Sequence, residues 1–308
     1  MALPFVSFFI VSYNQEKYIA DAVKGALSQN YPNMEIIISD DCSTDGTWSI
    51  IQETISNYSG DKNIRLNRNN HNLGIREHIN KVLYELARGE IIVFAAGDDI
   101  SLPNRTSVSV SFLEKHPEVS SLSFSSQAVD ESLKPFPIET VYTLSCGLDS
   151  IITLEDYVLY DYFIFSGDSR VIRRKVIESF PKLRYPAAED IYIFIRSLYV
   201  GSVAYIRQPL VLYRQHKNNV SKLTHISKEV FEQTVQRQIL EDLDYAVTHH
   251  FLREGQKSCV LRRLDWVNKE LFFQCVGRQR EQHSLLYRIA KSIKHEMKES
   301  WLKWKANS

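Results

Sequence analysis

The amino-acid sequence predicts an α/β protein with a doubly wound, mainly parallel sheet and a helical C-terminal extension. Short apolar segments rich in β-branched and aromatic residues alternate four times with segments whose apolar residues recur at helical spacing. The connections between these segments are short, as they are where helices join parallel strands. From about residue 227 onward the pattern is helical and contains no proline, which marks the C-terminal extension.

The first two strands and the first two helices have the clearest patterns. Residues 5–11 and 35–39 are short and mostly apolar, which is typical of strands buried on both faces. Residues 16–29 carry apolar side chains at helical spacing. A second helix opens near Thr44 and Asp45, and either residue suits the N-cap because its side-chain oxygen can accept a backbone N–H.

The later segments continue the alternation. They are a short strand near 64–66, a helix over about 76–87, a strand at 91–96, a helix from Pro103 to about His116, a strand at 119–125, helices at 174–180 and 188–200, and a pair of strands near 203–213. Residues 130–165 have no pattern that we could assign. We divide the chain into a sheet-containing domain, residues 1–222, and a helical region, residues 223–308.

Composition narrows the class of protein. The 308 residues include 37 basic and 37 acidic side chains, without a basic stripe, which argues against a nucleic-acid partner. The four cysteines form no CxxC pair, so we expect neither structural zinc nor a disulfide framework. No segment reaches the roughly 18 to 20 uncharged apolar residues of a spanning helix, and the N-terminus lacks a signal-peptide pattern. We therefore expect a soluble, cytoplasmic protein.

Acidic pairs follow two of the predicted strands. Asp98 and Asp99 come directly after residues 91–96, and Asp40 and Asp41 end an earlier strand. Because the carboxyl ends of parallel strands meet at one edge of a sheet, we expect the two pairs to lie close together. Adjacent buried acids repel each other and lose hydration, which a cation offsets. A solvated turn is the simpler alternative, but in this chain we favour a site for Mn²⁺ or Mg²⁺.

Five motifs together resemble those of the family 2 glycosyltransferases, which have the GT-A fold. In order, they lie within residues 6–14, 27–31, 40–47, 70–74 and 87–99. The resemblance covers about residues 4–120 and, more loosely, 160–220. It implies an inverting glycosyltransferase of bacterial polysaccharide or O-antigen synthesis. The turn after the first strand has no glycine, so a dinucleotide fingerprint of the NAD-binding kind is absent.

The resemblance also implies roles for residues around the donor, a nucleotide-diphosphate sugar that usually carries UDP in this family. Tyr13 would stack on the base, Asp41 would bind the base, and Arg76 would reach the diphosphate. Asp98 would lie near the ribose or the sugar. Asp99 would be the principal ligand of Mn²⁺ or Mg²⁺.

Further roles follow for the second half of the chain. Asp190 would be the general base, with Glu189 as the alternative, although acids in this position also stabilise a helix N-terminus. His216 would complete the metal shell or donate a hydrogen bond to phosphate, and Arg214 would offset the charge of the departing nucleotide. Asp168 would contact the acceptor or the donor sugar. The other histidines have no partner nearby in the sequence, and we expect them at the surface.

Residues 285–305 combine tryptophans and lysines in an amphipathic pattern that suits an anionic membrane surface. We therefore predict peripheral contact with the inner face of the plasma membrane and a glycan acceptor carried on a lipid diphosphate. A helix that packs on its own domain, or that forms a homodimer, is the alternative for this tail.

Two rival functions stay open. A nucleotidyltransferase would need a triphosphate-binding loop that we do not find. A non-catalytic scaffold that binds nucleotide-sugar within a polysaccharide synthesis complex would be expected to have lost the acids, yet Asp41, Asp98, Asp99 and Asp190 are all present. The sequence therefore favours an enzyme.

Overall fold

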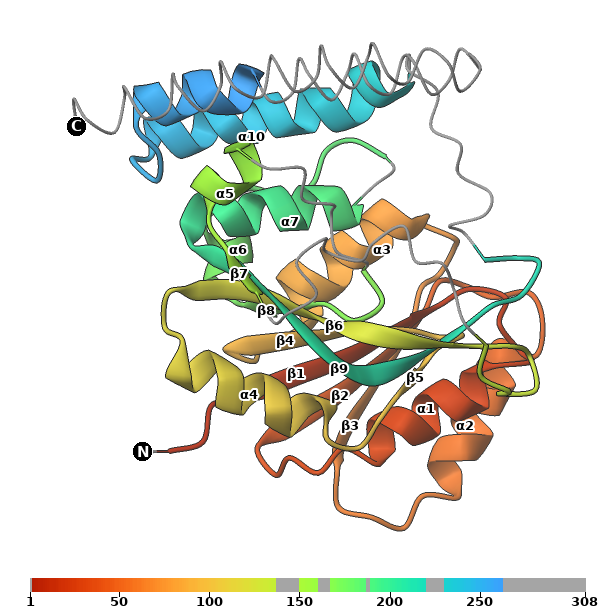
Figure 1. The fold of residues 1–308 in the computed structure, drawn as a ribbon. Helices are drawn as coiled ribbons and strands as arrows, with labels where there is room; N and C mark the ends of the chain where they lie inside the picture. The colour runs from red at the N-terminus through yellow and green to blue at the C-terminus, as the bar shows by residue number, and fades with distance from the viewer. Residues whose placement is uncertain (1, 137–149, 160–166, 187–188, 220–229, 263–308) are drawn as a thin grey trace.

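The computed structural model describes residues 2–136, 150–159, 167–186, 189–219 and 230–262 (Figure 1). Its strands are β1 (Val6–Ser12), β2 (Met34–Asp40), β3 (Asn63–Arg68), β4 (Ile91–Ala96), β5 (Ile100–Ser101), β6 (Val119–Val129), β7 (Ser150–Ile152), β8 (Val171–Arg173) and β9 (Ser202–Arg214). Its helices are α1 (Ile19–Leu27), α2 (Thr47–Ser56), α3 (Ile75–Lys81), α4 (Arg105–Lys115), α5 (Leu154–Leu159), α6 (Lys175–Glu178), α7 (Glu189–Val200) and α10 (Arg237–Thr248), with π-helical segments η1 (Val82–Leu86) and η2 (Phe231–Gln236).

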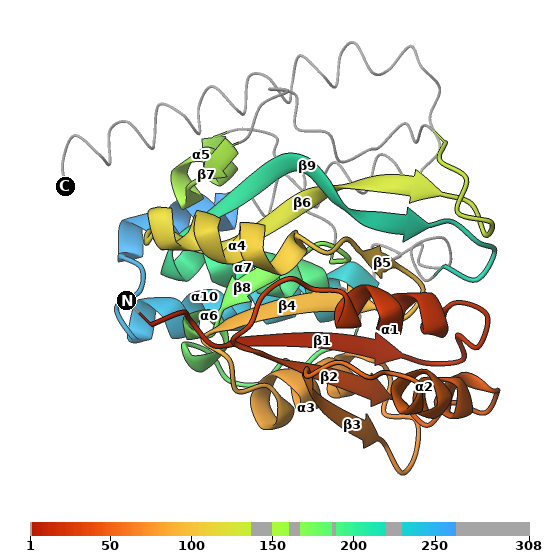
Figure 2. The same cartoon turned by 90° about the horizontal axis from the view of Figure 1, so that it is seen from below.

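The strands form one mixed sheet in the order β3-β2-β1-β4-β8-β6-β9-β5, with β7 paired to β9 (Figures 1 and 2). The first four of these strands are parallel to one another. In β1, Phe8 packs among residues of α1, α2 and α4, whereas Phe9 packs among residues of α3, η1, α6 and α7. Successive side chains of a strand point to opposite faces, so both faces of the sheet are covered by helices. The predicted doubly wound, mainly parallel α/β fold is confirmed.

Burial on both faces explains why the apolar segments form central strands. Val6, Phe8, Phe9 and Ile10 of β1 are completely buried. Each such side chain contributes roughly 1.5–3 kcal/mol relative to an exposed position. This apolar packing holds β1 and its neighbouring strands in place. The polar residues of the candidate site lie in the loops at the strand ends.

The prediction of two strands near 203–213 is wrong. The structure has a single strand there, β9, which is 13 residues long and mostly parallel to β6. Pro209 cannot donate to the ladder, and the register shifts at this place: Ile206 lies opposite Phe124, but Pro209 lies opposite Ser125. The irregularity accommodates the proline without ending the strand.

Two smaller predictions also need correction. The helix predicted over 76–87 is α3 followed by the π-helical η1. The N-cap of α2 is Gly46 rather than Thr44 or Asp45. Asp45 still serves the helix end, because its Oδ1 accepts the backbone N–H of Thr47 at 3.0 Å.

The described part of the helical C-terminal region packs on the sheet-containing domain (Figure 1). Val235, Ile239 and Leu243 are buried in one cluster with residues of α5 and α7. Arg196 of α7 forms a bidentate ion pair with Asp242 of α10, with both N–O distances 2.7 Å. The domain boundary at 222 stays a prediction, and residues 285–305 lie outside the described part. Within the described residues, no helix has the length and apolar character to cross a bilayer.

Candidate active site

The loops that follow β1, β2 and β4 meet at the carboxyl edge of the parallel strands. The backbone N–H of Asp41 donates to the carbonyl of Ser12 at 2.9 Å, and the N–H of Gly97 donates to the carbonyl of Val11 at 3.0 Å. The expected convergence of the two acidic pairs on one edge is therefore confirmed. Of the residues predicted to bind the donor or the metal, Tyr13, Asp41, Asp98 and Asp99 lie on these three loops.

The first two loops are joined by side-chain hydrogen bonds. The N–H of Asn14 donates to Ser43 Oγ at 2.9 Å, and the N–H of Thr44 donates to Asn14 Oδ1 at 2.9 Å. Asn14 and Cys42 both have positive φ, 52° and 58°. Tyr13 directly precedes Asn14, and its side chain is 45% exposed. Its ring is therefore accessible to a base.

Asp41 is buried and holds the loop before α3 in place. Its Oδ1 accepts from Asn69 Nδ2 at 2.8 Å and from the N–H of Leu73 at 2.9 Å, and its Oδ2 accepts from the N–H of Gly74 at 2.9 Å. Gly74 has φ 76°, a conformation that side-chain-bearing residues rarely adopt. An ionised carboxylate can accept about four hydrogen bonds, so Asp41 retains some capacity toward a base.

The structure brings His216 to Asp98 rather than to Asp99. His216 Nε2 lies 3.0 Å from Asp98 Oδ2. Asp99 is buried, and its Oδ1 accepts the backbone N–H of Arg214 at 2.9 Å. Burial, and then the nearby carboxylates Asp98 and Asp168, raise the pKa of Asp99 well above its usual range. A buried carboxylate that already accepts a backbone N–H is less suited to meet a ligand than its neighbour.

The hydrogen bonds of His216 indicate which ring nitrogen carries the proton of the neutral imidazole. Its Nδ1 accepts the backbone N–H of Asn218 at 3.2 Å, which places the ring proton of the neutral imidazole on Nε2. That proton points to Asp98. Ligation of a metal through Nε2 requires this proton to leave, whereas donation to a phosphate oxygen does not. Both roles expected for His216 therefore involve the same ring nitrogen.

Arg214 is buried and is bound to protein atoms on three sides. Its Nη2 donates to Asp21 Oδ2 at 2.8 Å, its Nε to the carbonyl of Asp98 at 3.1 Å, and its Nη1 to the carbonyl of Glu131 at 3.1 Å. The guanidinium also lies over the ring of Tyr18, 5.0 Å from its centroid. Arg214 thus joins α1, the acidic loop and the turn after β6, and its positive charge stays close to the site.

Arg76 is directed away from the acidic pair. Its Nη2 lies 2.9 Å from Glu77 Oε1, and its Nη1 donates to the carbonyl of Arg184. A role at the diphosphate requires the guanidinium to exchange these partners. The assignment of Arg76 stays a prediction.

Asp190 lies in the first turn of α7, at the end that faces the β8 segment. Its Oδ1 accepts the N–H of Ile191 at 2.9 Å, and its carbonyl accepts from the buried Arg170 at 2.7 Å. A Cβ on Gly167 would come within 3.3 Å of the Asp190 Cβ, so the two chains nearly touch. Burial of its carboxyl group and the neighbouring Asp190 raise the pKa of Glu189 to about 7.

Asp168, beside this contact, has one carboxylate oxygen bound and one without a partner. Its Oδ2 accepts from Ser126 Oγ at 2.5 Å, and its Oδ1 is buried with no hydrogen-bond partner among the described residues. Such an oxygen could accept a sugar hydroxyl. The predicted contact of Asp168 with a sugar has a suitable acceptor but no further support.

Sequence reasoning missed the completely buried Arg105. Its guanidinium donates to the carbonyl of Phe94 at 2.6 Å and to that of Arg170 at 3.3 Å, which ties β4 to the segment before β8. Burial lowers the pKa of Arg105 to about 10, against the opposing effect of Asp168 and Asp99. The available signal was an arginine in the first turn of a helix, where the helix dipole disfavours a cation.

His78 was expected at the surface, and this expectation is wrong. The residue is buried, and its Nε2 lies 2.6 Å from Ser39 Oγ. Burial lowers the pKa of His78. His78 lies one turn inside α3, the helix that follows the loop held by Asp41. Its contact with Ser39 joins this helix to β2 and so supports the site.

The described residues contain no cluster of three or more histidine, cysteine or acidic side chains suited to a metal. The Asp98–His216 pair offers two donors, and Mg²⁺-type sites commonly combine one or two protein ligands with substrate phosphates. The pair therefore fits a cation that arrives with a diphosphate.

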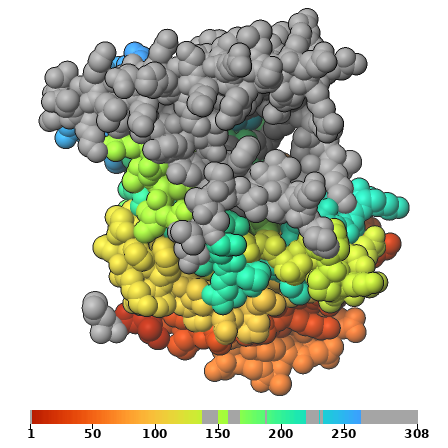
Figure 3. Space-filling view, in the orientation of Figure 1, coloured from red at the N-terminus to blue at the C-terminus, as the bar shows by residue number. Residues whose placement is uncertain are grey.

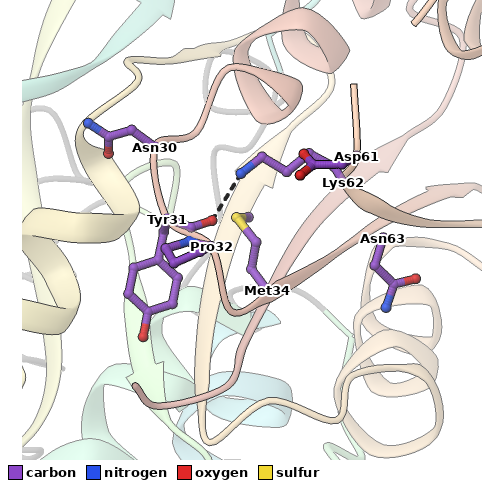
Figure 4. Close-up of a pocket in the computed structure, with 7 residues that line it drawn as sticks. All are labelled: Asn30, Tyr31, Pro32, Met34, Asp61, Lys62 and Asn63. Atoms are coloured by element: carbon purple, nitrogen blue, oxygen red, sulfur yellow. Dashed lines mark hydrogen bonds between the residues drawn. The ribbon is translucent and has the colours of Figure 1, made fainter. Parts of the chain in front are cut away.

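A cavity among the described residues lies elsewhere (Figure 4). It has a volume of about 330 Å³ and is lined by Asn30, Tyr31, Pro32, Met34, Asp61, Lys62 and Asn63. These residues precede or begin β2 and β3, so the cavity opens at the amino edge of the sheet. It is separate from the acidic loops at the carboxyl edge.

Comparison with known proteins identifies related chains. The Bacillus subtilis protein EpsE is 40% identical over 113 residues, which are 37% of this chain and 40% of EpsE. WfaP of Escherichia coli, a UDP-Glc:alpha-D-GlcNAc-diphosphoundecaprenol beta-1,3-glucosyltransferase, is 39% identical over 109 residues, which are 35% of this chain and 41% of WfaP. The matched part of this chain thus spans about two fifths of these curated relatives.

Solved structures share the fold. S. aureus TarS in complex with UDP-GlcNAc superposes with a TM-score of 0.64 at 19% identity, covering 91% of this chain and 75% of TarS. The mannosyltransferase PcManGT from Pyrobaculum calidifontis, in complex with GDP-Man and Mn²⁺, gives a TM-score of 0.55 at 16% identity, covering 98% of this chain and 87% of PcManGT. The sequence pattern of Glycosyl transferase family 2 matches residues 7–180, more than half of the chain. With its GT-A fold and its acidic loops at the carboxyl edge of the sheet, this chain belongs to glycosyltransferase family 2.

Proposed function

We propose that the protein is an inverting, metal-dependent glycosyltransferase that moves a hexose or N-acetylhexosamine from a nucleotide-diphosphate sugar to a hydroxyl of a glycan acceptor. The observation that carries the proposal is the 3.0 Å contact of His216 with Asp98 at the carboxyl edge, beside Tyr13 and Asp41. The strand order β2-β1-β4 places the proposed base-binding Asp41, the base-stacking Tyr13 and the metal donor Asp98 in succession along the same edge. This order suits an extended nucleotide diphosphate.

For the donor we propose a UDP-sugar. TarS, which has the same fold, is seen with UDP-GlcNAc, and the name of WfaP specifies UDP-glucose. PcManGT is seen with GDP-mannose, so the fold itself also accepts guanine. The choice of nucleotide is therefore a question for binding measurements.

For the metal we propose Asp98 and His216 as the ligands, with Mn²⁺ or Mg²⁺ as the ion. This revises the sequence-based assignment of Asp99, because the carboxylate of Asp99 is buried against Arg214. When bound, the cation would neutralise negative charge that develops on the leaving diphosphate. Arg214 lies close enough to add to the positive field without leaving its own partners.

For the general base we propose Asp190. The acceptor hydroxyl has a pKa far above 7, so a carboxylate must take its proton as the new C–O bond forms at the anomeric carbon. The bond from that carbon to the diphosphate oxygen breaks in the same step, and the diphosphate leaves with the electron pair. A single displacement of this kind inverts the configuration at the anomeric carbon.

For the acceptor we propose a glycan linked to a lipid diphosphate at the cytoplasmic face of the membrane, in surface polysaccharide synthesis. The name of WfaP specifies an acceptor of this chemistry. The amphipathic, lysine-rich pattern of residues 285–305 is a second, independent reason to expect a membrane-borne acceptor.

Calorimetric titration of the full chain with UDP, GDP and dTDP, with and without Mn²⁺, tests the proposal. We expect one nucleotide to bind in a metal-dependent way. Asp98→Asn should weaken that binding by more than the roughly 10–100-fold typical of losing an outer partner of a metal ligand. Asp61→Asn, an exposed acid at the opposite edge of the sheet, is the matched control.

The same titration separates the alternatives. A larger loss of metal-dependent nucleotide binding from Asp99→Asn than from Asp98→Asn would favour Asp99, as expected from the sequence, as the metal ligand. Nucleotide-sugar binding without any turnover would support the non-catalytic scaffold. An absence of binding to all three nucleotides would contradict the proposed function.

A further inference from the structure

His216 lies on a loop after β9 that is closed by a single asparagine. Asn219 Oδ1 accepts the backbone N–H of His216 at 2.5 Å, and Asn219 Nδ2 donates to the carbonyl of Arg214 at 2.9 Å. These bonds fix the backbone of the loop. The imidazole ring is oriented by further contacts: its Nδ1 accepts the backbone N–H of Asn218 at 3.2 Å, and its Nε2 meets Asp98 at 3.0 Å.

The ring of Tyr18 lies directly against that imidazole. The two ring centroids are 4.6 Å apart, and the ring planes are inclined by 29°, which is a stacked arrangement. The phenol is itself held, because its hydroxyl donates to Glu131 Oε2 at 3.0 Å. Arg214 lies 5.0 Å from the same ring. Tyr18 is thus fixed at both its hydroxyl and its aromatic surface.

Tyr18 is not a core residue. It is partly exposed and belongs to none of the apolar clusters of the sheet-containing domain. Its side-chain contacts are with residues that surround the acidic loop: His216, Arg214 and Glu131. A partly exposed aromatic side chain outside the apolar clusters, whose hydrogen bond and ring contacts lie around one site, is better explained by that site than by stability.

We propose that Tyr18 is a positioning residue that holds the imidazole of His216 against Asp98 and thereby sets the affinity of the site for a divalent cation. This inference rests on the proposed function, since it assumes that His216 and Asp98 bind the metal. Without the stacked ring, only the long hydrogen bond from the Asn218 N–H, at 3.2 Å, holds the imidazole when Asp98 turns to a cation, so that cation binding must order the imidazole further. Partners that orient a metal ligand typically change metal affinity by about 10–100-fold.

The test is Mn²⁺-dependent binding of UDP, or of whichever nucleotide the wild type binds, measured by calorimetry on full-length variants. Tyr18→Leu should weaken the metal-dependent binding about tenfold and leave binding of the nucleotide without metal unchanged. Tyr18→Phe keeps the ring and should recover most of the affinity. Tyr58→Leu, the same substitution at a partly buried position just after the C-terminal end of α2, is the matched control.

A double-mutant cycle separates positioning from a general structural role. In a His216→Gln background there is no imidazole to position, so adding Tyr18→Leu should change Mn²⁺-dependent binding by less than about twofold. A structural role would give the same loss in both backgrounds. Where Tyr18→Leu does not fold, as judged by its melting curve, Tyr18→Met fills a similar volume without a ring and takes its place.

The outcomes are distinct for the two proposals. Wild-type protein that binds nucleotide with Mn²⁺, together with a Tyr18→Leu variant that binds equally well, would overturn this inference and leave the proposed function intact. An equal loss in the two backgrounds would also overturn it. Wild-type protein that shows no Mn²⁺-dependent binding would overturn both the proposed function and the inference.

Discussion

Two adjacent carboxylates at the start of α7 have different surroundings. Burial and the charge of Asp190 raise the pKa of Glu189 to about 7, so near neutral pH a large fraction of Glu189 is protonated. Asp190 accepts the N–H of Ile191 through Oδ1, which leaves Oδ2 for another partner. A base must be ionised before the reaction and must have an oxygen that can reach the acceptor hydroxyl. These requirements favour Asp190.

We therefore expect Asp190→Asn to lower kcat by about 10²–10⁴-fold while donor binding persists, because only proton transfer is lost. Glu189→Gln is the matched control, and it should retain activity within about tenfold. The measurements are steady-state transfer to a glycan acceptor and calorimetric binding of the donor nucleotide. The assignment of the base would be reversed by a Glu189→Gln variant that loses more activity than Asp190→Asn.

The raised pKa of Glu189 should also make the stability of the folded protein depend on pH. Its pKa rises from 4.5 to about 7 in the folded protein, so between these values the folded state holds a proton that the unfolded state has released. Stability conferred by the neutral carboxyl group is therefore lost as the pH rises from about 4.5 to about 7. Glu189→Gln removes this dependence. Relative to the wild type, the variant should gain up to about 3 kcal/mol between pH 4.5 and pH 8, visible as a melting-temperature difference that grows with pH.

At the residue scale, the sequence predicted which side chains gather but not how they pair. Acids after buried strands must lie at one edge of a parallel sheet, so the convergence of Asp41 with Asp98 followed from topology alone. The pairing of His216 with Asp98 instead of Asp99 depends on the conformation of a turn, because one residue along a loop reverses the direction of a side chain. The buried Arg105 was missed since its partners are two backbone carbonyls and the hydroxyl of Ser101, and no acidic side chain in the sequence marks it as a paired cation.

At the scale of elements, the ion pair between α7 and α10 links the predicted helical region to the helix whose first turn contains Asp190. Both side chains are almost completely buried, and Arg196 also donates to the carbonyl of Pro181 at 2.8 Å. Burying two charges is costly, so the pair contributes specificity of packing more than net stability. Removing one partner leaves the other charge buried and unpaired, and the free-energy cost of burying that charge is then no longer offset.

Arg196→Met alone should lower the free energy of unfolding by about 3–5 kcal/mol, because it leaves Asp242 buried without its cation. The double variant Arg196→Met, Asp242→Leu should recover most of this loss. Urea unfolding followed by circular dichroism measures both. The control is the exposed pair of Lys182 with Glu85, where Lys182→Met should cost no more than about 1 kcal/mol. Equal losses at the two pairs would contradict the argument.

Element length decided which parts of the fold could be predicted. The apolar strand β4 was found with its bounds, residues 91–96, and β1 and β2 were found to within one residue at each end, since burial on both faces selects apolar residues throughout. The strands β5 and β8 have only two and three residues, too few for any periodicity to appear. They owe their strand geometry to pairing with β9, β4 and β6, which is tertiary information.

At the scale of the whole molecule, the two edges of the sheet differ in character. The carboxyl edge carries the acidic loops, and the amino edge carries the cavity around Tyr31 and Lys62, whose Nζ donates to the carbonyl of Tyr31 (Figure 4). The described part of the helical region packs beside α5 and α7 (Figure 1). Figure 3 shows the first half of the chain, coloured red to yellow, packed together in the lower part of the molecule. Under the proposed function, the acceptor would approach the acidic loops at the carboxyl edge.

The tail at 285–305 bears on how the lipid-linked acceptor that we propose would reach that edge. Each basic residue near an anionic membrane surface contributes about 1 kcal/mol of attraction, so reversing three charges should weaken membrane binding by well over tenfold. Lys291, Lys294 and Lys298 recur on one helical stretch of the sequence and are the positions of choice. We expect the triple lysine-to-glutamate variant of the full chain to fail to float with anionic vesicles that carry the wild type.

A variant with the same change in net charge at exposed lysines of the body, Lys24, Lys115 and Lys134 to glutamate, is the control and should still float. Zwitterionic vesicles should carry neither protein, because the attraction is electrostatic and is screened within about 10 Å at 0.1 M salt. Equal flotation of the two variants would remove the membrane as the partner of the tail. The tail would then be assigned to packing on its own domain or to a homodimer, which sedimentation of the same variants distinguishes.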